Sequence, residues 1–348
     1  MSAIKKQFIV LITIFISFLN AYGIEKDAIL ISADDAVKLI GAEHVVFVSA
    51  DSIDIYRQGH IKESVWMYAY DLHDSNILGE MLCSPLFSCS SKASNYIGSK
   101  GINNDSLVIV YDNYSGINAT GVYIYLKSYG HKSVRILNGG LGAISKLDPN
   151  KKIYDSIYTE SMLDENQDIT IKQEFTERLN DVERNLLILK GEEEKIIPKL
   201  YTIDKINLDY SNIASKNEVM LAMEDILKNG EKSDYVIIDT RSMNEIIGEK
   251  IVDDVARGGH IPGALFIESK RVVDEKNRLS FKSIEELSNL FASYNITRDK
   301  TIYAYSHVGS RRASQIITAL KIAGYKNVKV YTGSWDEWGN DLSLPIKR

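Results

Sequence analysis

Residues 301–311 have the sequence Thr301-Ile-Tyr-Ala-Tyr305 followed by Ser306-His-Val-Gly-Ser-Arg311, and this stretch gives the clearest indication of the fold. Its first five residues are β-branched or aromatic except for one alanine, which is typical of a buried strand. The six residues that follow make a short loop. Beyond the loop, apolar residues recur at helical spacing as far as Gly324, where a helix would stop. The stretch therefore predicts a buried strand that passes through a tight loop into a helix.

The same alternation extends toward the N-terminus of this half of the chain. Val236-Ile-Ile238 is another β-rich run of buried-strand length, and Ile284, Leu287 and Phe291 recur at the spacing of a helix. Alternating buried strands and helices are typical of a parallel β-sheet with helices packed on both faces. We therefore predict an α/β fold whose working loops lie at the carboxyl ends of strands.

The pattern occurs twice in the chain. Gly59-His-Ile61 recurs as Gly259-His-Ile261, and a second apolar run, Leu107-Val-Ile-Val-Tyr111, matches residues 301–305. Asp112 closes the first run and Ser306 closes the second. Matched intervals of this kind indicate two copies of one domain, which we expect at residues 29–147 and 205–348. After each closing residue, intervals of eighteen, four and five residues lead to Gly130 and Gly324, then Val134 and Val328, then Gly139 and Gly333.

Residues 148–204 lie between the two copies and predict a helical connector. Apolar residues there alternate steps of four and three, which is typical of an amphipathic helix. Two heptads are too few to sustain a coiled coil, so we expect this helix to pack on its own domains. An acidic patch, Glu192–Glu194, predicts a solvent-exposed turn between Gly191 and Pro198. The apolar stripe comprises Phe175, Leu179, Val182, Leu186 and Leu189.

The N-terminus has the pattern of a secretory signal peptide. Lys5 and Lys6 precede an apolar run, Phe8 to Leu19, and Ala21-Tyr-Gly23 supplies small residues for a cleavage site. The run is shorter than the ~20 residues that a membrane-spanning helix needs. We therefore expect residues 1–23 to be removed and the remaining chain to be soluble and exported, with a bacterial periplasm as the expected destination.

Composition excludes several classes of protein. At 348 residues the chain suits two domains, and its 45% apolar content excludes a disordered chain. It has 41 Lys and Arg against 47 Asp and Glu, with no long basic run, so nucleic-acid binding is not expected. The two cysteines, Cys83 and Cys89, are too few for a disulfide scaffold, and no Cys/His spacing indicates structural zinc. We expect neither a metal nor another cofactor. After export, the two cysteines could form one small disulfide or remain incidental thiols.

The loop after residue 305 is the candidate site. A six-residue loop above a helix N-terminus can turn backbone N–H groups inward, which makes a pocket for an anion or an anionic sulfur. Arg311 and Arg312 at the helix start oppose its dipole unless a carboxylate or bound anion compensates. An ordinary turn whose arginines pair with local acids such as Asp239 is equally compatible. In the pocket hypothesis Gly309 adopts a turn conformation that other residues avoid. The loop comprises Ser306, His307, Val308, Gly309, Ser310 and Arg311.

In their order along the chain, the motifs resemble those of the tandem rhodanese family, the thiosulfate and 3-mercaptopyruvate sulfurtransferases. The resemblance covers most of residues 29–147 and 212–348 but not the connector. It implies two rhodanese-like domains, each with a helix-flanked parallel sheet. The second copy carries Asp239-Thr-Arg241-Ser with Glu245, Arg257-Gly-Gly-His-Ile-Pro-Gly-Ala264, the loop, Gly324-Tyr-Lys-Asn-Val328, Tyr331-Thr-Gly-Ser-Trp335-Asp-Glu-Trp338-Gly-Asn340 and Leu344-Pro-Ile346.

The resemblance implies a sulfur-transfer mechanism. In active members the first loop residue is a cysteine, whose thiolate takes a sulfane sulfur from thiosulfate or a mercapto-acid. The persulfide then passes its sulfur to cyanide or to a thiol, including a thiol of an acceptor protein. The family's substrate-binding arginines correspond to Arg241 and Arg257, with Arg311 in the loop. Asp239, His260 and Asp112 correspond to structural positions. His60 and His260 recur in both copies, so we interpret both as structural hydrogen-bonding residues.

The chain departs from the family pattern at the decisive position, where Ser306 replaces the cysteine. An alcohol has a far higher pKa than a thiol, and it cannot enter thiol–disulfide exchange. His307 is adjacent, but nothing else indicates a Ser–His–Asp relay. Asp112 occupies the equivalent place in the first copy, which we therefore interpret as a scaffold. Cys83 and Cys89 do not fall at the nucleophile position.

Three hypotheses follow from the sequence. The first is an exported sulfurtransferase that is catalytically impaired or uses another thiol. The second is a non-catalytic module that binds an oxyanion or a partner protein on the same scaffold. The third is a phosphatase, which is the weakest because such enzymes use the same missing cysteine and a longer loop.

Overall fold

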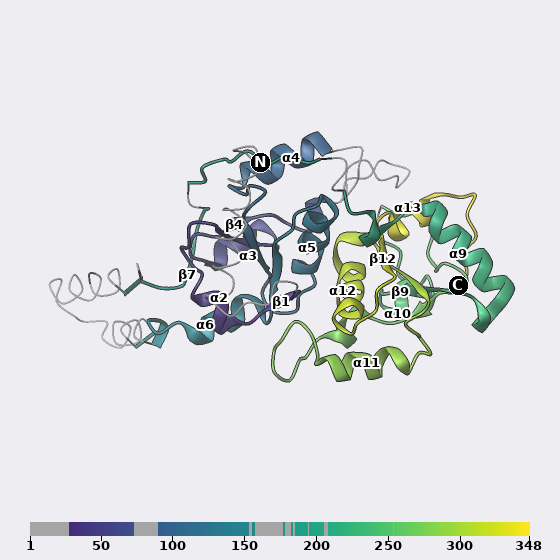
Figure 1. The fold of residues 1–348 in the computed structure, drawn as a ribbon. Coiled ribbons are helices and arrows are strands. Elements are labelled where there is room, and N and C mark those ends of the chain that lie inside the picture. The colour runs from purple at the N-terminus through teal and green to yellow at the C-terminus, as the bar shows by residue number, and fades with distance from the viewer. Residues whose placement is uncertain are drawn as a thin grey trace, which may run out of the picture.

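Two α/β domains lie side by side in the computed structural model, one from each half of the chain (Figure 1). The structure describes residues 28–72, 90–152, 185–193, 195–204, 208–252 and 254–348, together with 155–156, 177 and 182–183. The predicted signal peptide, Cys83, Cys89 and part of the predicted connector helix, including Phe175 and Leu179, lie outside these residues. Within the described part of the chain, no helix combines the length and the apolar character needed to span a membrane.

Each domain is built on a five-stranded parallel sheet, and the strand order is the same in both. The first sheet has the order β1 (Leu30–Ile31), β6 (Val134–Leu137), β5 (Leu107–Tyr111), β2 (Val45–Ser49) and β4 (Val65–Trp66). The second has the order β8 (Ile213–Ala214), β12 (Val328–Tyr331), β11 (Thr301–Tyr305), β9 (Tyr235–Asp239) and β10 (Leu265–Phe266). The matching orders confirm the predicted fold in two copies.

Helices follow the strands as the spacing of apolar residues predicts. In the first domain they are α2 (Ala33–Val37), α3 (Ile53–Gln58), α4 (Ser90–Ser99), α5 (Ala119–Ser128) and α6 (Gly140–Leu147), with a short helical turn η1 (Tyr70–Leu72). In the second they are α9 (Lys216–Asn229), α10 (Met243–Ile246), α11 (Ile284–Ala292), α12 (Ser314–Ile322) and α13 (Ser334–Asn340), with the turns η4 (Tyr210–Asn212), η5 (Gly230–Lys232), η6 (Ser269–Val272) and η7 (Gly309–Ala313).

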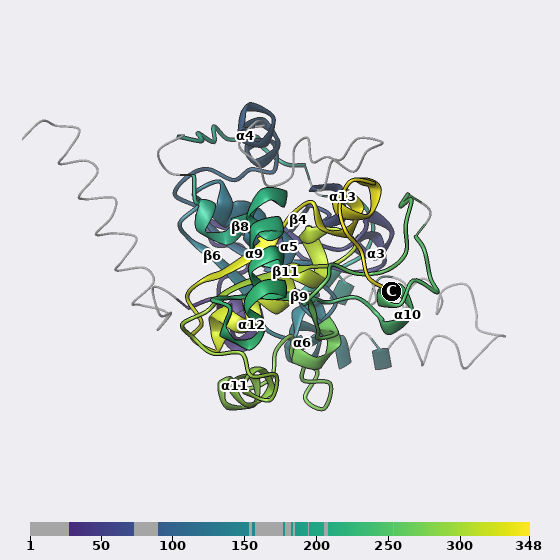
Figure 2. The same cartoon turned by 90° about the vertical axis from the view of Figure 1, so that its right-hand side faces the viewer.

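Helices cover both faces of each sheet, because successive side chains of a buried strand point to opposite faces. On β11, Tyr303 and Tyr305 pack with α9 and α13 on the outer face, while Ile302 and Ala304 face α11 and α12. Figure 2 shows α9 in front of β9 and β11. The inner faces of the two sheets belong to one continuous hydrophobic core that crosses the domain boundary.

The repeated Gly-His-Ile segments make the same two contacts in both copies. Ile61 donates its N–H to the Tyr111 hydroxyl and Ile261 to the Tyr305 hydroxyl, each at 3.0 Å. Each segment also pairs antiparallel with a segment that comes later in the chain. The strand β3 (His60–Ile61) pairs with β7 (Ile188–Leu189), and His260 pairs with Lys347. The duplication therefore extends to this antiparallel pairing.

From Leu186 onward the described part of the connector is an extended strap, whereas its described residues 151–152, 155–156, 177 and 182–183 are helical. Leu189 belongs to β7, so the prediction that it ends an amphipathic helix is wrong. Antiparallel pairing with β3 satisfies the backbone here and outweighs the helical spacing. The strap continues along the first domain, where Lys199 donates its N–H to the Gly98 carbonyl and Tyr201 is buried.

In the acidic patch the Glu192 side chain is 73% exposed, as in the solvated turn that the composition predicts, but Glu193 makes specific contacts with the first domain. The Glu193 side chain accepts a hydrogen bond from the Trp66 backbone N–H and forms an ion pair with Lys100 at 3.1 Å. Lys100 itself lies over the Trp66 ring, 5.2 Å from its centre. Glu193 therefore fastens the strap to the first domain, and a local charge count could not have revealed that partner.

The two domains meet along α5 and α12, which lie side by side at the centre of Figure 1. On α5, a Cβ added at Gly121 would lie 1.7 Å from the Ser310 carbonyl oxygen. Nearby, the Gln315 side chain donates to the Ser115 carbonyl at 2.6 Å. Ser280 accepts from the Gly139 N–H at 3.1 Å and donates to the Tyr114 carbonyl at 2.8 Å. The loop that follows β11 is thus pressed against the first domain.

We expect Gly121→Ala to lower the free energy of unfolding by roughly 2 kcal/mol, because its new methyl group would overlap the backbone of the facing loop. Urea denaturation would measure the change. Gly142→Ala in α6 is the matched control, since its Cβ would meet only the Asn113 carbonyl at 3.5 Å. That variant should be neutral or gain up to about 1 kcal/mol from helix propensity. Equal stability of the two variants would contradict the close approach.

Stability should fall in acid through His131. Burial lowers the pKa of His131 to about 4, while its two ring nitrogens lie 3.2 Å from the Tyr201 hydroxyl and 3.0 Å from the Ser106 carbonyl. Between about pH 6.5 and 4, His131 is therefore protonated in the unfolded chain but not in the folded chain. Stability is full above this window and is lost as the pH falls through it.

The measurement is urea unfolding at pH 7.5 and 4.5 for the natural chain and for His131→Gln. The natural chain should lose roughly 2–3 kcal/mol more than the variant on acidification. Parallel losses in both proteins would show that His131 does not carry the effect.

Candidate active site

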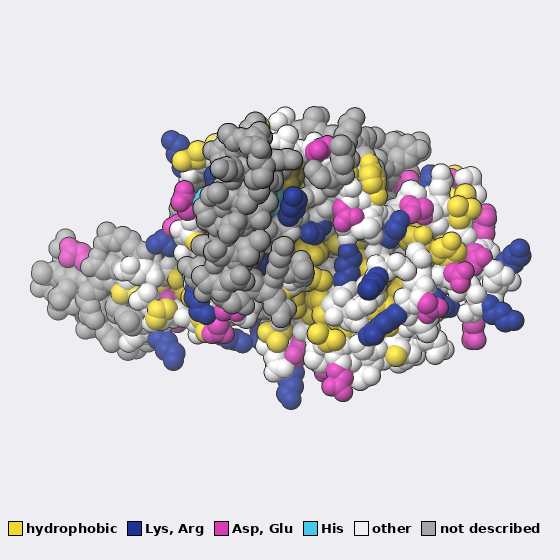
Figure 3. Space-filling model, in the orientation of Figure 1, with side chains coloured by type: hydrophobic (Ala, Val, Ile, Leu, Met, Phe, Trp, Pro, Cys, Tyr) yellow, Lys and Arg dark blue, Asp and Glu magenta, His cyan; other side chains and the backbone are white. Residues whose placement is uncertain are grey.

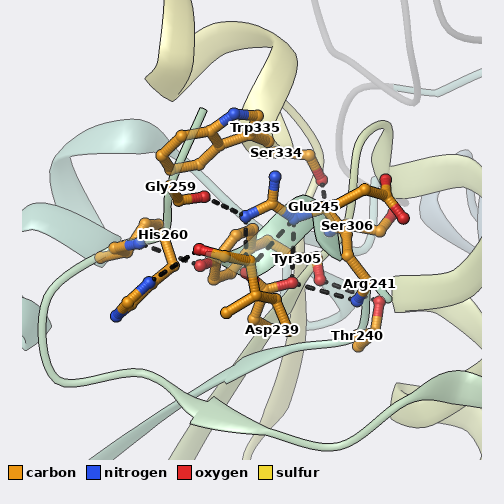
Figure 4. Close-up of polar contacts among 12 residues, drawn as sticks. Asp239, Thr240, Arg241, Glu245, Gly259, His260, Tyr305, Ser306, Ser334 and Trp335 are labelled. Atoms are coloured by element: carbon orange, nitrogen blue, oxygen red, sulfur yellow. Dashed lines mark hydrogen bonds and ion pairs between the residues drawn. The ribbon is translucent and has the colours of Figure 1, made fainter. Parts of the chain in front are cut away.

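The candidate site is the loop between β11 and α12, at the carboxyl end of the central strand of the second sheet. Ser306 begins the loop and is 1% exposed. Its N–H donates to the Ser334 hydroxyl at 3.2 Å, and its carbonyl accepts from the Trp335 N–H at 2.9 Å. The first turn of α13 thus holds Ser306 at the end of the strand (Figure 4).

The loop closes on itself in a way that the sequence did not predict. The Ser306 hydroxyl donates to the Val308 carbonyl oxygen, so an acceptor faces the side chain where an inward N–H was expected. The Gly309 N–H points to the segment after β12 and donates to the Thr332 carbonyl at 3.3 Å. The prediction that these N–H groups line an open anion pocket is therefore wrong for Gly309 in this conformation.

Gly309 is required for space rather than for its backbone angles. Its φ lies outside the left-handed region, contrary to the predicted turn. A Cβ there would lie 2.7 Å from the Thr332 Cα, so only glycine fits between the loop and the chain after β12. The next residue, Ser310, presses its carbonyl on Gly121. Its hydroxyl is buried without a hydrogen-bond partner among the described residues.

The equivalent loop of the first copy does form the predicted cradle. Asp112 is buried at the place of Ser306, and its carboxylate accepts N–H bonds from Gly116, Asn118 and Ala119 at 3.0, 3.0 and 3.3 Å. Burial raises the pKa of Asp112, while these three bonds oppose that rise. Loops of this type therefore can hold an anion on backbone N–H groups, and the first copy fills its own cradle.

Arg241 does not have the open position expected of a substrate-binding group. Its guanidinium pairs with Asp239, with Nη2 to Oδ2 at 2.7 Å and Nε to Oδ1 at 3.0 Å. Nη2 also donates to the Gly259 carbonyl at 2.6 Å, and the guanidinium lies 4.4 Å from the centre of the Trp335 ring (Figure 4). Asp239 pairs with Arg241 and so is not the acid that pairs with the loop arginines.

Arg257 is likewise turned away from the loop. It donates to the carbonyl oxygens of Gly339, Leu344 and Trp338 at 3.1, 2.9 and 3.0 Å, and also to that of Asp341. Four acceptors around the end of α13 occupy its donors. The predicted substrate-binding role of Arg257 is therefore corrected to a structural one, the capping of a helix C-terminus.

Arg312 finds the compensating carboxylate that a basic helix start requires. It makes a two-pronged ion pair with Glu245, at 2.8 and 2.9 Å. Burial alone would raise the pKa of Glu245, but the bonds from Arg312 and Ser242 lower it to about 2. The pair ties the start of α12 to α10.

Arg311 alone of these arginines reaches across to the first domain. Its Nε donates to the Asn118 Oδ1 at 2.8 Å, and the Asn118 Nδ2 donates to the Asp51 Oδ1 at 2.7 Å. Burial and the nearby Asp112 raise the pKa of Asp51 to about 6. Sequence reasoning missed Asn118 and Asp51. The duplication contains a signal for Asp51, because the strand registers align Ser49 with Asp239 and thus Asp51 with Arg241.

The histidines are placed for structure and not for a relay. The His260 Nδ1 lies 3.0 Å from the Ile246 carbonyl, and its counterpart His60 lies 3.0 Å from the Tyr56 carbonyl. The His307 Nε2 lies 3.3 Å from the Asp254 Oδ1, while the Ser306 hydroxyl bonds to Val308. No cluster of three or more His, Cys, Asp or Glu that could hold a metal occurs among the described residues.

Comparison with known proteins gives one family in both halves. The rhodanese-like domain model matches residues 32–147 and 222–341. A Mycolicibacterium smegmatis protein with the provisional name thiosulfate sulfurtransferase is 28% identical over 327 residues, which cover 92% of this chain and 97% of that one. The sulfur carrier protein TtuD of Thermus thermophilus is 28% identical over 254 residues, with 71% and 73% coverage.

Solved structures show the same fold. SseA from Escherichia coli, described as a 3-mercaptopyruvate sulfotransferase, has a TM-score of 0.62 at 22% identity and covers 88% of this chain and 99% of its own. EanB in a complex with ergothioneine covalently linked with a persulfide cysteine has a TM-score of 0.65 at 19% identity, with 92% and 70% coverage. The family matches, the paired sheets and the structural neighbours agree, and the chain belongs to the rhodanese family, with one rhodanese-like domain in each half.

Proposed function

We propose that this chain is an exported member of the sulfurtransferase family in which sulfur transfer is impaired because Ser306 stands at the nucleophile position. Its relatives carry sulfurtransferase and sulfur-carrier names, and SseA is described as acting on 3-mercaptopyruvate. The substrate class is accordingly a small sulfur oxyanion such as thiosulfate, or a mercapto-acid. The signal-like residues 1–23 support export, with a bacterial periplasm as the proposed destination.

The observation that carries the impairment is the state of the Ser306 side chain. Sulfur transfer from thiosulfate requires a thiolate that attacks the outer sulfur, so that an S–S bond forms, the original S–S bond breaks and sulfite leaves with the electron pair. The Ser306 hydroxyl keeps its proton and donates it to Val308. It would have to form an O–S bond, and no adjacent base is in contact with it among the described residues.

A second candidate is a non-catalytic module that binds an oxyanion or a partner protein. Arg311 favours it, because its two terminal guanidinium nitrogens make no hydrogen bond within the described part of the chain, whereas both of those of Arg312 and one of those of Arg241 are engaged. An arginine with both terminal nitrogens available can bind an oxyanion in a two-pronged manner. The outer part of the second domain carries interspersed acidic and basic side chains, which gives a protein partner no surface of uniform charge there (Figure 3).

A gain-of-function substitution tests the main proposal. We expect the natural chain to transfer no measurable sulfur from thiosulfate to cyanide. Ser306→Cys should raise the rate roughly 100-fold or more above background, because a thiol of nearly the same size would supply the missing nucleophile. Thiocyanate formation is the measurement, and Ser306→Ala is the control that should remain inactive. Turnover by the natural chain that disappears in Cys83→Ser or Cys89→Ser would refute the proposal.

Thermal unfolding with added anions tests the second candidate. At about ten times their dissociation constant, thiosulfate, sulfite or sulfate should raise the Tm by about 2 °C over chloride at equal ionic strength. Arg311→Gln should abolish the shift. Arg298→Gln is the matched control, because Arg298 precedes the opposite end of β11. If no anion shifts the Tm of the natural chain, the oxyanion-binding candidate fails.

A further inference from the structure

We propose that Asn118 of the first domain is a positioning residue for the oxyanion site of the second domain, because it holds Arg311 in place without neutralising it. The inference rests on the proposed oxyanion site at this loop and adds a residue from the other domain to it. It accounts for a side chain that neither the duplication nor the family resemblance marks.

The first step concerns which arginine can meet an anion. Arg257 and Arg312 have both terminal nitrogens bound to protein acceptors, and Arg241 has its Nη2 bound to Asp239 and to the Gly259 carbonyl. Arg311 makes its one hydrogen bond among the described residues through Nε, to Asn118. Of these four arginines, Arg311 thus retains both terminal nitrogens for a ligand, which is the arrangement that two-pronged recognition of an oxyanion needs.

The second step concerns how Asn118 is itself oriented. Its backbone N–H donates to Asp112 at 3.0 Å, and its side-chain Nδ2 donates to Asp51 at 2.7 Å. Because a carboxylate can only accept, the amide must present its oxygen to the opposite side, where Arg311 lies. Asn118 is 7% exposed, so water does not compete for these bonds.

The third step concerns charge. Asp51 and Asp112 both act electrostatically on Arg311 from the first domain, yet no carboxylate lies within 4.0 Å of its guanidinium among the described residues. The neutral amide of Asn118 lies between Asp51 and Arg311. It passes the orientation set by Asp51 to Arg311 while leaving the positive charge available to a ligand, whereas a direct ion pair would consume it.

The loop geometry makes this support necessary. Arg311 interrupts the helical turn η7, with φ −135° and ψ −105°, so the helix does not fix the direction of its side chain. The contact across the domain boundary supplies that direction. A two-domain arrangement is therefore needed for the ligand-binding arginine, even though the loop and its backbone belong entirely to the second domain.

The experiment uses the full chain after signal removal, with Ser306→Cys as the parent for kinetics and the natural chain for binding. Asn118→Ala should raise the KM for thiosulfate roughly tenfold and change kcat much less, because it loosens Arg311 and leaves the thiol in place. In the natural chain, Asn118→Ala should weaken sulfate binding by a similar factor, as measured by titration calorimetry.

Asn104→Ala is the matched control. Asn104 also bridges two segments, with 2.8 and 2.9 Å bonds to the Thr202 backbone, but it is remote from the loop. It should lower the Tm and leave KM and sulfate affinity unchanged. If Asn118→Ala fails to fold, Asp51→Asn replaces it. That variant removes the constraint on the Asn118 amide, and it should raise KM about threefold.

The outcomes separate the two proposals. An active Ser306→Cys parent whose KM and sulfate affinity are unchanged by Asn118→Ala overturns the positioning role and leaves the proposed function intact. An inactive parent counts against the proposed function, and sulfate binding to the natural chain then decides the role of Asn118 alone. Absence of sulfate binding, with no effect of either variant, overturns both.

Discussion

The close approach of the loop to helix α5 constrains the conformation of the candidate site. The Ser310 carbonyl lies where a side chain at position 121 would have to be, so the loop and α5 are in backbone contact. On its other side the loop contacts Thr332 through Gly309. Held between these two glycine-permitted contacts, the loop turns its Val308 carbonyl toward Ser306 and sends Arg311 across the boundary to Asn118.

The equivalent loops of the two copies differ in their charged groups and in the direction of their backbone N–H groups. The first copy keeps the N–H cradle and fills it with the carboxylate of Asp112. The second copy keeps the arginines but turns an acceptor inward. The exchange extends to the neighbouring strand, where Asp51 of the first copy occupies the position of Arg241 in the second. Charge is thus lost at one matched place and inverted at another, and the two loops meet a common boundary through Asn118 and Arg311.

Much of the fold could be predicted from local signals, because each buried strand and each amphipathic helix carries its own apolar period. The runs Leu107–Tyr111 and Thr301–Tyr305 are strands at those bounds. The connector could not be predicted in the same way. The partner of Leu189 is in β3 and the partner of Glu193 is Lys100, so long-range pairing outweighed local spacing.

The candidate site was predictable in its position but not in its contacts. The duplication located Ser306 and the loop arginines from spacing alone. Whether the donors of an arginine are already hydrogen-bonded can depend on backbone carbonyl oxygens, as it does for Arg257. Residue types do not reveal such acceptors. Asn118 was invisible for a related reason, since its role depends on a domain boundary that no local pattern describes.

The substitution at Ser306 and the conformation of the loop are physically linked. A hydroxyl has a proton to donate, and it stabilises a loop whose Val308 carbonyl points inward. A thiolate has no such proton, and the same carbonyl would repel it. A cysteine at this position would therefore favour the opposite orientation, with N–H groups turned inward as they are around Asp112. Serine at this position thus stabilises the one loop arrangement in which a nucleophilic anion would have no cradle.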